Sequence, residues 1–364
     1  MENTMKSVNA AILGTWGKGE KFAGLVNNYK GCRVVCVWDY NPANAESVAE
    51  RIGCRAEADI DKVMADPEID GVIIITENFM HAELMLKAAE AGKHIFVEKP
   101  MCTDILDAYK VQDAVKRNNV KFFMSDPFVG AACIYSKSLI ENKTIGKVLN
   151  ARIRLCEDFK VTDDVEELRL LTEKTGGGMM SDTGGHALHV AEFLFGMPEE
   201  VSAMFSYSSQ AASACSREEY VNIIMKYADG MVFNAECSTI SPNFTNCIEI
   251  TGTNGIIVDT GTVRHDHSVR YLRTGEFKTK PFEPAAQISD WTFAGEEDMP
   301  EDPDRHVIYW LRMIMEDISR EQHENDMKGT SGLGIDKAVE LMEMRQAIYE
   351  SAQTGMSVKI KRRV

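Results

Sequence analysis

Three ionisable side chains stand at helical spacing in the segment GGGMMSDTGGHALHV, residues 176–190. Asp182, His186 and His189 follow one another at steps of four and three residues, which places them on one face of a helix. Such a face can ligate zinc or manganese, because aspartate and histidine bind both metals. It can also hold a proton relay beside a redox cofactor, because histidine exchanges a proton near neutral pH. The segment alone leaves both interpretations open.

A glycine-rich turn, GTWGKGEKF, follows the apolar run VNAAIL near the amino terminus. Gly14 and Gly19 occupy the outer positions of the dinucleotide-binding pattern G-x-G-x-x-G, while Trp16 stands at its middle position. In that pattern the turn and the start of the next helix bind a pyrophosphate through backbone N–H groups. The match is imperfect, and the competing interpretation is an ordinary glycine-rich turn. We expect Gly14, Thr15, Trp16 and Gly19 to bind a dinucleotide.

A carboxylate follows the second apolar run. Asp39 closes the segment VVCVWD twenty residues after Gly19, where a carboxylate accepts hydrogen bonds from a ribose diol and repels a 2′-phosphate. Asp39 and its neighbour Tyr40 are therefore expected to bind the cofactor and to favour NAD over NADP. The alternative is that Asp39 is a surface residue before a turn.

The first third of the chain alternates short apolar runs with longer periodic segments. The apolar runs, each about as long as a buried strand, are VNAAIL, RVVCVW, GVIIIT, HIFVE and KFFM. Pro42 opens one periodic segment and Gly53 closes it, in the order expected for a helix. Continuous apolar strands separated by helices indicate a parallel sheet covered on both faces. We predict a doubly wound α/β domain whose ligands bind at the carboxyl ends of the strands.

Length and charge limit the partners that the protein can have. A chain of 364 residues exceeds what one hydrophobic core usually supports, so we expect two domains. A formal net charge of −16 disfavours nucleic acid and anionic lipid. No run approaches the roughly 20 apolar residues of a membrane helix, and the amino terminus lacks a signal-peptide pattern. The nine cysteines include no C-x-x-C pair, which favours reduced thiols and a cytoplasmic protein.

The segment IIITENFMHAELMLKAAEAGKHIFVEKP resembles the GFO/IDH/MocA family of oxidoreductases. The family shows T-P-x-x-x-H followed by A-G-K-H and E-K-P at this place, and here Glu77 replaces the proline. The residues that match are Thr76, Asn78, His81, Ala89, Gly92, Lys93, His94, Glu98, Lys99 and Pro100. LIENKTIGKV, the GGG segment and the late AIYESAQTGMSVKI match as well, so the resemblance spans nearly the whole chain.

The resemblance implies a Rossmann domain over residues 1–125, followed by an α/β domain over 126–364 that is built on a large, mostly antiparallel open sheet. The sequence of the second part agrees, because strand-like runs are joined by turn-like segments at 228–230 and 253–255. Late helices near 303–319 and 335–353 are expected to pack back on the first domain. The stretch 274–304 is expected to be a long loop, and the sheet to support a homo-oligomer.

The resemblance also implies roles for individual residues. Lys99 is expected beside the nicotinamide, facing Asp182 and His186, and these three form the expected catalytic set. The residues expected to bind the cofactor through this motif are Thr76, Asn78, His81, Glu98 and Lys99. The residues expected to bind the substrate are Lys99, Asp126, Arg169, Asp182 and His186. The family uses no metal, so we expect none here. His189 stands where the family commonly has aspartate, and His265 and His267 are expected to be solvated loop residues.

The expected reaction is a reversible, NAD-dependent oxidation of a secondary hydroxyl on a neutral sugar, inositol or glycoside, with C3 of a glucosyl unit favoured. A base is needed within reach of that hydroxyl, because hydride loss requires its proton to leave as well. Pro127 and Phe128 follow Asp126 where the family often has arginine, which disfavours a charged substrate. Two alternatives remain: an NAD-cycling glycosidase or lyase without net redox change, and a non-catalytic sensor that uses NAD to regulate a protein partner.

Overall fold

The computed structural model describes residues 7–15, 18–126, 128–158, 162, 164–241, 246–264, 269–273, 292–293, 305–318 and 332–363. Trp16, Pro127, His265, His267 and all of the stretch 274–304 except residues 292 and 293 lie outside the described residues. The chain forms two compact units. The first unit comprises Met1–Asp126, Glu173–Gly176 and Asp302–Met342, and the second comprises Pro127–Thr172, Gly177–Glu301 and Glu343–Val364. Each unit is described by itself below.

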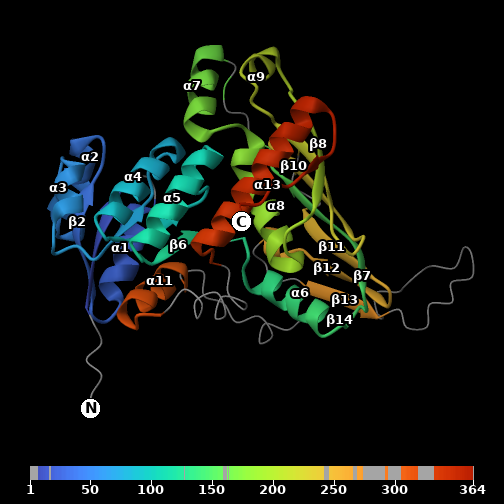
Figure 1. The fold of residues 1–364 in the computed structure, drawn as a ribbon, viewed down its shortest axis with the longest axis horizontal. Coiled ribbons are helices and arrows are strands. Elements are labelled where there is room, and N and C mark those ends of the chain that lie inside the picture. The colour runs from blue at the N-terminus through green and yellow to red at the C-terminus, as the bar shows by residue number, and fades with distance from the viewer. Residues whose placement is uncertain are drawn as a thin grey trace, which may run out of the picture. The chain divides into compact units, whose positions relative to one another are not determined.

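The first unit contains a six-stranded parallel sheet in the order β3-β2-β1-β4-β5-β6, which confirms the predicted doubly wound architecture (Figure 1). Its strands are β1 (Val8–Leu13), β2 (Cys32–Trp38), β3 (Arg55–Ala56), β4 (Gly71–Ile74), β5 (His94–Glu98) and β6 (Phe122–Ser125). Its helices are α1 (Gly19–Asn28), α2 (Pro42–Ile52), α3 (Ile60–Ala65), α4 (Asn78–Glu90), α5 (Ile105–Arg117) and α11 (Arg305–Met315). All five predicted runs form strands, and only the two-residue β3 had no counterpart in the prediction.

Local signals set the ends of these helices. The side chain of Asn41 accepts a hydrogen bond from the backbone N–H of Ala43 at 3.2 Å, Pro42 occupies the first turn of α2, and Gly53 ends the helix in the left-handed conformation. The apolar sides of α1, α2 and α11 form one buried cluster with β1 and β2. Trp310 of α11 is fully buried there, in an edge-to-face contact with Phe96. The late helix therefore completes the core of the first unit.

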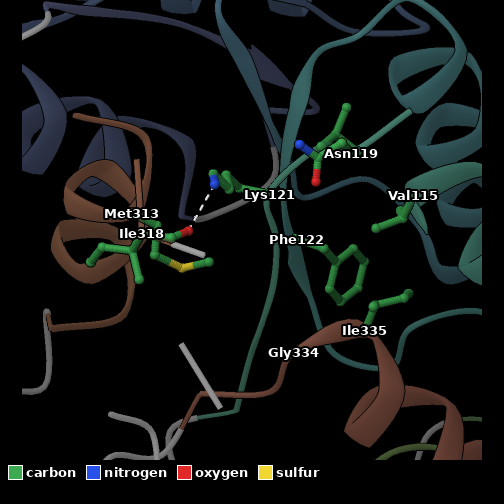
Figure 2. A pocket seen from close by; sticks show the side chains of 9 residues that line it. Val115, Asn119, Lys121, Phe122, Met313, Ile318, Gly334 and Ile335 are labelled. Carbon is green, nitrogen blue, oxygen red and sulfur yellow. Dashed lines mark hydrogen bonds between the residues drawn. The ribbon is translucent and has the colours of Figure 1, made fainter. Parts of the chain in front are cut away.

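A small cavity lies within the first unit, at the ends of α5 and α11 and the start of the long helix α13 (Ile335–Thr354) (Figure 2). Lys121 donates a hydrogen bond to the carbonyl oxygen of Ile318 at 2.7 Å and forms an ion pair with Asp317 at 2.9 Å. Val115, Phe122 and Ile335 supply apolar lining. None of the predicted site residues lines this cavity, so we interpret it as a packing seam that fixes the end of α11.

The second unit is built on a nine-stranded sheet in the order β14-β13-β12-β11-β7-β10-β9-β8-β15. Its strands are β7 (Val148–Cys156), β8 (Glu200–Ser206), β9 (Tyr220–Lys226), β10 (Val232–Ser238), β11 (Cys247–Gly252), β12 (Gly255–Asp259), β13 (Val269–Arg273), β14 (Thr292–Phe293) and β15 (Val358–Lys359). Among these described strands β7 and β10 pair in parallel, and the other neighbours pair antiparallel. The predicted mostly antiparallel sheet and both predicted turns are confirmed.

One face of this sheet is covered by helices of the same unit (Figure 1). The elements that contact it are α6 (Ala131–Glu141), the 3₁₀ turn η1 (Met179–Ser181), α8 (Thr183–Phe195) and α10 (Gly261–Arg264). Helices α7 (Val165–Thr175) and α9 (Gln210–Ala214) precede η1 and β9 in the chain. Helix α8 contacts β7 and β10 and is buried along nearly its whole length. On the opposite face of the sheet Met204, Ile224 and Val232 are exposed. The sheet therefore holds α8, and with it the candidate histidine, in a fixed position.

Candidate active site

The turn after β1 is formed by Gly14. Its φ of +93° is one that residues with a side chain rarely adopt, and a Cβ atom here would lie 2.8 Å from the backbone of Ile75 and Thr76. The backbone N–H of Gly14 donates to the carbonyl oxygen of Trp38, and that of Ile75 donates to Leu13. The carboxyl ends of β1, β2 and β4 are thereby drawn together, with Gly19 starting α1 behind the turn. Only glycine fits at position 14.

Asp39 lies where the sequence predicts a ribose-binding carboxylate, but it is already engaged. It is 4% exposed, and its Oδ2 atom accepts hydrogen bonds from the N–H of Thr15 at 2.9 Å and from the hydroxyl of Thr15 at 2.6 Å. Its Oδ1 atom accepts from the N–H of Asn41 at 2.9 Å. Tyr40 is exposed, and the neighbouring Glu77 carboxylate raises the pKa of the Tyr40 hydroxyl. Asp39 thus shapes the turn, and the carboxylates create a negative edge that disfavours a 2′-phosphate.

The other predicted cofactor residues follow β4. The hydroxyl oxygen of Thr76 is buried without a hydrogen-bond partner among the described residues, whereas the Asn78 amide donates to the carbonyl oxygen of Thr175 at 3.3 Å. His81 is 1% exposed, and its ring nitrogens lie 2.8 Å from the carbonyl oxygen of Pro100 and 3.0 Å from that of Thr76. Burial lowers the pKa of the His81 imidazole, and these carbonyl oxygens oppose that shift. His81 therefore ties the end of β4 to the turn after β5.

That turn carries Glu98 and Lys99. Glu98 is buried at the end of β5 and forms an ion pair with Lys18 at 3.1 Å, which connects it to the start of α1. Lys99 is half-buried and follows directly. The close-packed Gly14 turn and the start of α1 directly after it are features that a dinucleotide-binding site requires. The residues of the first unit therefore fit NAD.

In the second unit, η1 leads into Asp182, which precedes the first residue of α8 and is exposed. His186 lies one helical turn later, is 6% exposed, and stacks on the ring of Phe128 with ring centroids 3.9 Å apart and an interplanar angle of 12°. His189 is 1% exposed. The stacking on Phe128 was not predicted from the sequence, where the only signal was an aromatic residue in place of the family arginine.

A small cavity lies beside Asp182 in the second unit. It is lined by Thr162, Leu168, Gly178, Met179, Asp182, Arg217, Glu218, Glu219 and Thr239. Arg217 and Glu218 were not predicted as site residues, because no sequence motif surrounds them. Arg217 donates to the carbonyl oxygen of Gly177 at 2.8 Å, and burial lowers the pKa of its guanidinium. The cavity lining therefore combines three carboxyl groups with one guanidinium.

Arg169 and Asp126, which were predicted to bind the substrate, do not line this cavity. Arg169 is exposed on α7, where its guanidinium pairs with Glu166 at 2.8 Å. Asp126 is buried at the end of the first unit, 2% exposed. In the part of the chain that the structure describes, no three histidine, cysteine, aspartate or glutamate side chains are grouped so as to hold a metal ion.

The comparisons with known proteins agree with this geometry. A model described as an oxidoreductase family with an NAD-binding Rossmann fold matches residues 8–126, and a model of the GFO/IDH/MocA C-terminal domain matches residues 134–258. A scyllo-inositol 2-dehydrogenase (NAD(+)) of Bacillus subtilis is 30% identical over 273 residues, which cover 71% of this chain and 75% of that protein. The chain belongs to the GFO/IDH/MocA family. It is an NAD-binding oxidoreductase of that family, as the resemblance implied.

Two further similarities cover nearly the whole chain. A 2,7-anhydro-N-acetylneuraminate hydratase of Mediterraneibacter gnavus is 28% identical over 350 residues, which cover 92% of this chain and 88% of that protein. A levoglucosan dehydrogenase, solved in complex with NADH and levoglucosan, superimposes with a TM-score of 0.78 at 21% identity over 98% of this chain and all of that one. The second similarity supports the fold alone.

Two findings bear on the setting of the protein. Among the described residues no helix is long and apolar enough to cross a membrane. All nine cysteines are described, and each is a free thiol. Burial raises the pKa of several of them, Cys32 to about 11, so these thiols resist ionisation and behave as small apolar side chains.

Proposed function

We propose that the protein oxidises a secondary hydroxyl group of a neutral sugar, inositol or glycoside in an NAD-dependent and reversible reaction. The observation that carries this proposal lies in the second unit, where His186 stacks on Phe128 one helical turn after the exposed Asp182. The first unit supports it separately, because its Gly14 turn fits a dinucleotide. Relatives that act on inositol support the substrate class. When bound, NAD accepts the hydride from the carbinol carbon.

The residues of this chain handle the proton. We propose that Lys99, Asp182 and His186 form the catalytic set and also bind the substrate hydroxyl. Stacking on Phe128 fixes the plane of the His186 ring, so its nitrogens keep one orientation during turnover. Asp182 is exposed and is one turn before His186, where it can accept a hydrogen bond from a neighbouring substrate hydroxyl.

The lining of the small cavity favours an uncharged substrate. Asp182, Glu218 and Glu219 contribute carboxyl groups, and the one guanidinium, Arg217, already donates to a backbone carbonyl. A substrate carboxylate or phosphate would be repelled by the exposed Asp182 carboxylate, whereas a substrate hydroxyl can donate a hydrogen bond to it. Within the neutral class we favour C3 of a glucosyl unit. A ketone at C3 acidifies the neighbouring C–H groups and prepares a later bond cleavage.

The experiment is a screen of NAD reduction across free sugars, inositols and glycosides with the purified protein. Net oxidation produces NADH absorbance in proportion to the sugar consumed. The Lys99→Ala variant should lose roughly 100-fold or more in kcat, the range that positioned acid–base groups supply, while retaining NAD binding. Lys87→Ala is the control, because Lys87 is a half-buried lysine of α4 that pairs with Asp61 and is not a predicted site residue. Full activity of Lys99→Ala would rule out the proposed role of Lys99.

A second function, NAD cycling without net redox change, is favoured by one observation. The hydratase of Mediterraneibacter gnavus resembles this chain over 92% of its length, and a hydratase adds water without net oxidation. A cycling enzyme consumes an anhydro sugar or glycoside while the NADH absorbance stays constant. The same screen, with substrate loss followed by chromatography, distinguishes the two functions.

We further propose that the protein is a cytoplasmic homo-oligomer. Its nine free thiols suit a reducing compartment, and the apolar side chains of Met204, Ile224 and Val232 on the open face of the large sheet suit contact with a second copy. Light scattering during gel filtration tests the oligomeric state, with a Met204→Lys variant expected to weaken any assembly that uses this face.

A further inference from the structure

The turn that ends at Asp182 is packed so closely against its neighbours that two of its positions require glycine. We define the glycine turn as residues 177–182. Gly177 has a φ of +140°, and a Cβ atom there would lie 2.1 Å from the hydroxyl oxygen of Tyr349. At Gly178 a Cβ atom would lie 2.2 Å from the carbonyl oxygen of Glu218. At Gly177 and Gly178 the space that a side chain would occupy is therefore filled by Tyr349 and Glu218.

Glu218 grips the glycine turn through both its backbone and its side chain. Its Oε1 atom accepts hydrogen bonds from the N–H groups of Gly178 at 2.9 Å and Met180 at 3.0 Å. Its carbonyl oxygen accepts from the N–H of Met179 at 2.8 Å. The Glu218 side chain is 1% exposed, so these bonds are shielded from water. Three successive N–H groups of the turn are thus held by one residue that is 40 positions away in the sequence.

A chain of side-chain hydrogen bonds supports this grip from helix α13. Tyr349 donates to Oε1 of Glu218 at 2.7 Å, and its oxygen lies 3.1 Å from the hydroxyl of Ser181. Arg345 donates to the Ser181 hydroxyl at 2.8 Å and lies over the Tyr349 ring. The one O–H of Tyr349 donates its hydrogen bond to Glu218. The Ser181 hydroxyl is therefore the donor to the Tyr349 oxygen and the acceptor from Arg345. The direction of every bond in the chain is therefore defined.

We infer that Glu218 and Tyr349 are positioning residues that set the direction from which Asp182 and His186 reach the substrate. The inference rests on the proposed catalytic role of Asp182 and His186. Asp182 follows the last residue of η1 directly, and its N–H donates to the carbonyl oxygen of Met179, so a shift of the turn moves it. Neither Glu218 nor Tyr349 needs to touch the substrate for this effect.

The chemistry of the grip predicts which substitutions preserve it. Only Oε1 of Glu218 bonds to the turn, and Oε2 has no hydrogen-bond partner among the described residues. Glutamine has the same shape, and its amide oxygen can replace Oε1. Burial raises the pKa of the Glu218 carboxyl, so the neutral amide also suits this environment. Glu218→Gln should therefore keep the turn in place, whereas Glu218→Ala removes the acceptor altogether.

The test combines hydrogen exchange with kinetics on the full-length protein. Exchange of the peptide that contains residues 177–182, followed by mass spectrometry, should be faster in Glu218→Ala and unchanged in Glu218→Gln. With a sugar that turns over, Glu218→Ala should lose roughly ten- to a hundredfold in kcat, with the KM for NAD unchanged. Glu218→Gln should stay within about threefold of the unmodified enzyme, because it restores the geometry.

Tyrosine variants provide the matched control and cover the case in which Glu218→Ala does not fold. Tyr349→Phe removes a hydroxyl that bonds to Glu218, whereas Tyr227→Phe removes a buried hydroxyl without a partner among the described residues. The inference requires slower turnover and faster turn exchange in Tyr349→Phe but not in Tyr227→Phe. Equal behaviour of the two variants, or unchanged exchange in Glu218→Ala, would overturn it. If the unmodified protein oxidises no sugar, the proposed function fails, and the exchange data still decide whether the grip exists.

Discussion

Two turns carry the candidate catalytic residues, and one buried ionisable side chain binds the backbone at each of them. At the first turn this side chain faces backbone acceptors, and at the second it faces backbone donors. The turn after β5, which carries Lys99, is tied by His81, whose ring nitrogens face the carbonyl oxygens of Pro100 and Thr76. The glycine turn, which carries Asp182, is held by Glu218, whose carboxyl oxygen faces backbone N–H groups. The first turn, together with the end of β4, thus presents carbonyl acceptors to an imidazole, and the second presents N–H donors to a carboxyl oxygen.

The comparison shows that the backbone decides which side chain can hold a functional turn. A turn that leaves carbonyl oxygens without partners requires a buried donor, and a turn that leaves N–H groups without partners requires a buried acceptor. A neutral imidazole can donate from one nitrogen only, so one of the two carbonyl contacts of His81 is always the weaker. The grip of Glu218 has no such restriction, because one oxygen accepts three bonds. We therefore expect the glycine turn to be the more rigid of the two.

The largest effect is expected from adding one methyl group to the glycine turn or to the turn after β1, which packs against the end of β4. Gly178→Ala forces a Cβ atom against the Glu218 backbone and should lower the free energy of unfolding by about 2–3 kcal/mol, with a loss of kcat. Gly14→Ala forces a Cβ atom against Ile75 at a positive φ and should chiefly raise the KM for NAD. Urea denaturation and steady-state kinetics measure both outcomes.

Gly185→Ala is the matched control for these two changes. A Cβ atom at position 185 has nothing within 4 Å, and the residue lies inside α8, where alanine is favoured by up to about 1 kcal/mol. Equal or greater stability is expected. A loss as large as that of Gly178→Ala would show that the tight enclosure of the glycine turn is not what makes glycine necessary.

The next largest effect is expected from removing the donor that holds the lysine. His81→Ala removes the ring that contacts two buried carbonyl oxygens and donates to one of them, and should cost about 1–2 kcal/mol of stability. The KM for NAD should rise, because the ends of β4 and β5 are no longer connected. His81→Gln retains one N–H donor and should lose less. Denaturation and NAD titration that leave His81→Ala indistinguishable from the unmodified protein would contradict the comparison.

The smallest expected effect is on how the free energy of unfolding depends on pH. His81 and Glu218 should change this dependence in opposite directions. The folded state lowers the pKa of His81, so its contribution to stability is present above the unfolded value of about 6.5 and is lost as pH falls through the folded pKa. The folded state raises the pKa of Glu218, so its contribution is present below about 4.3 and is lost as pH rises through the folded pKa. His81→Gln and Glu218→Gln should each remove one slope from stability measured by denaturation across pH. Identical pH profiles for all three proteins would refute this assignment.

The sequence predicted those features that are determined locally. The strands, the Gly14 turn and the place of Asp39 follow from apolar runs and from glycine and carboxylate spacing over a few dozen residues. The sequence did not predict that Asp39 binds the hydroxyl and N–H of Thr15, because that bond depends on how the two turns meet. The parallel pairing of β7 with β10 was also missed, since both strands show the same alternation as their antiparallel neighbours.

The residues that hold the second turn could not be found from the sequence. Glu218 and Tyr349 lie 131 positions apart. Glu218 belongs to no recognised motif, and Tyr349 lies in the late segment AIYESAQTGMSVKI, whose resemblance to the family implies no contact with Glu218. A glutamate in the segment CSREEY looks like any surface glutamate until the fold buries it. Phe128 gave a weak signal as a departure from the family arginine, but its stacking on His186 requires α8 to be in place. These contacts join residues far apart in the sequence, so they could not be predicted before the packing of the elements was known.

The most direct test of the central claim, hydride transfer from a sugar carbon to NAD, uses a glucoside that carries deuterium at C3. After incubation with the protein and NAD, mass spectrometry of the cofactor should show deuterium on the nicotinamide, and one reduced cofactor per ketone formed. A cycling enzyme would still label the cofactor during turnover, although without net reduction. Consumption of the glucoside with no deuterium ever reaching the nicotinamide would contradict the account.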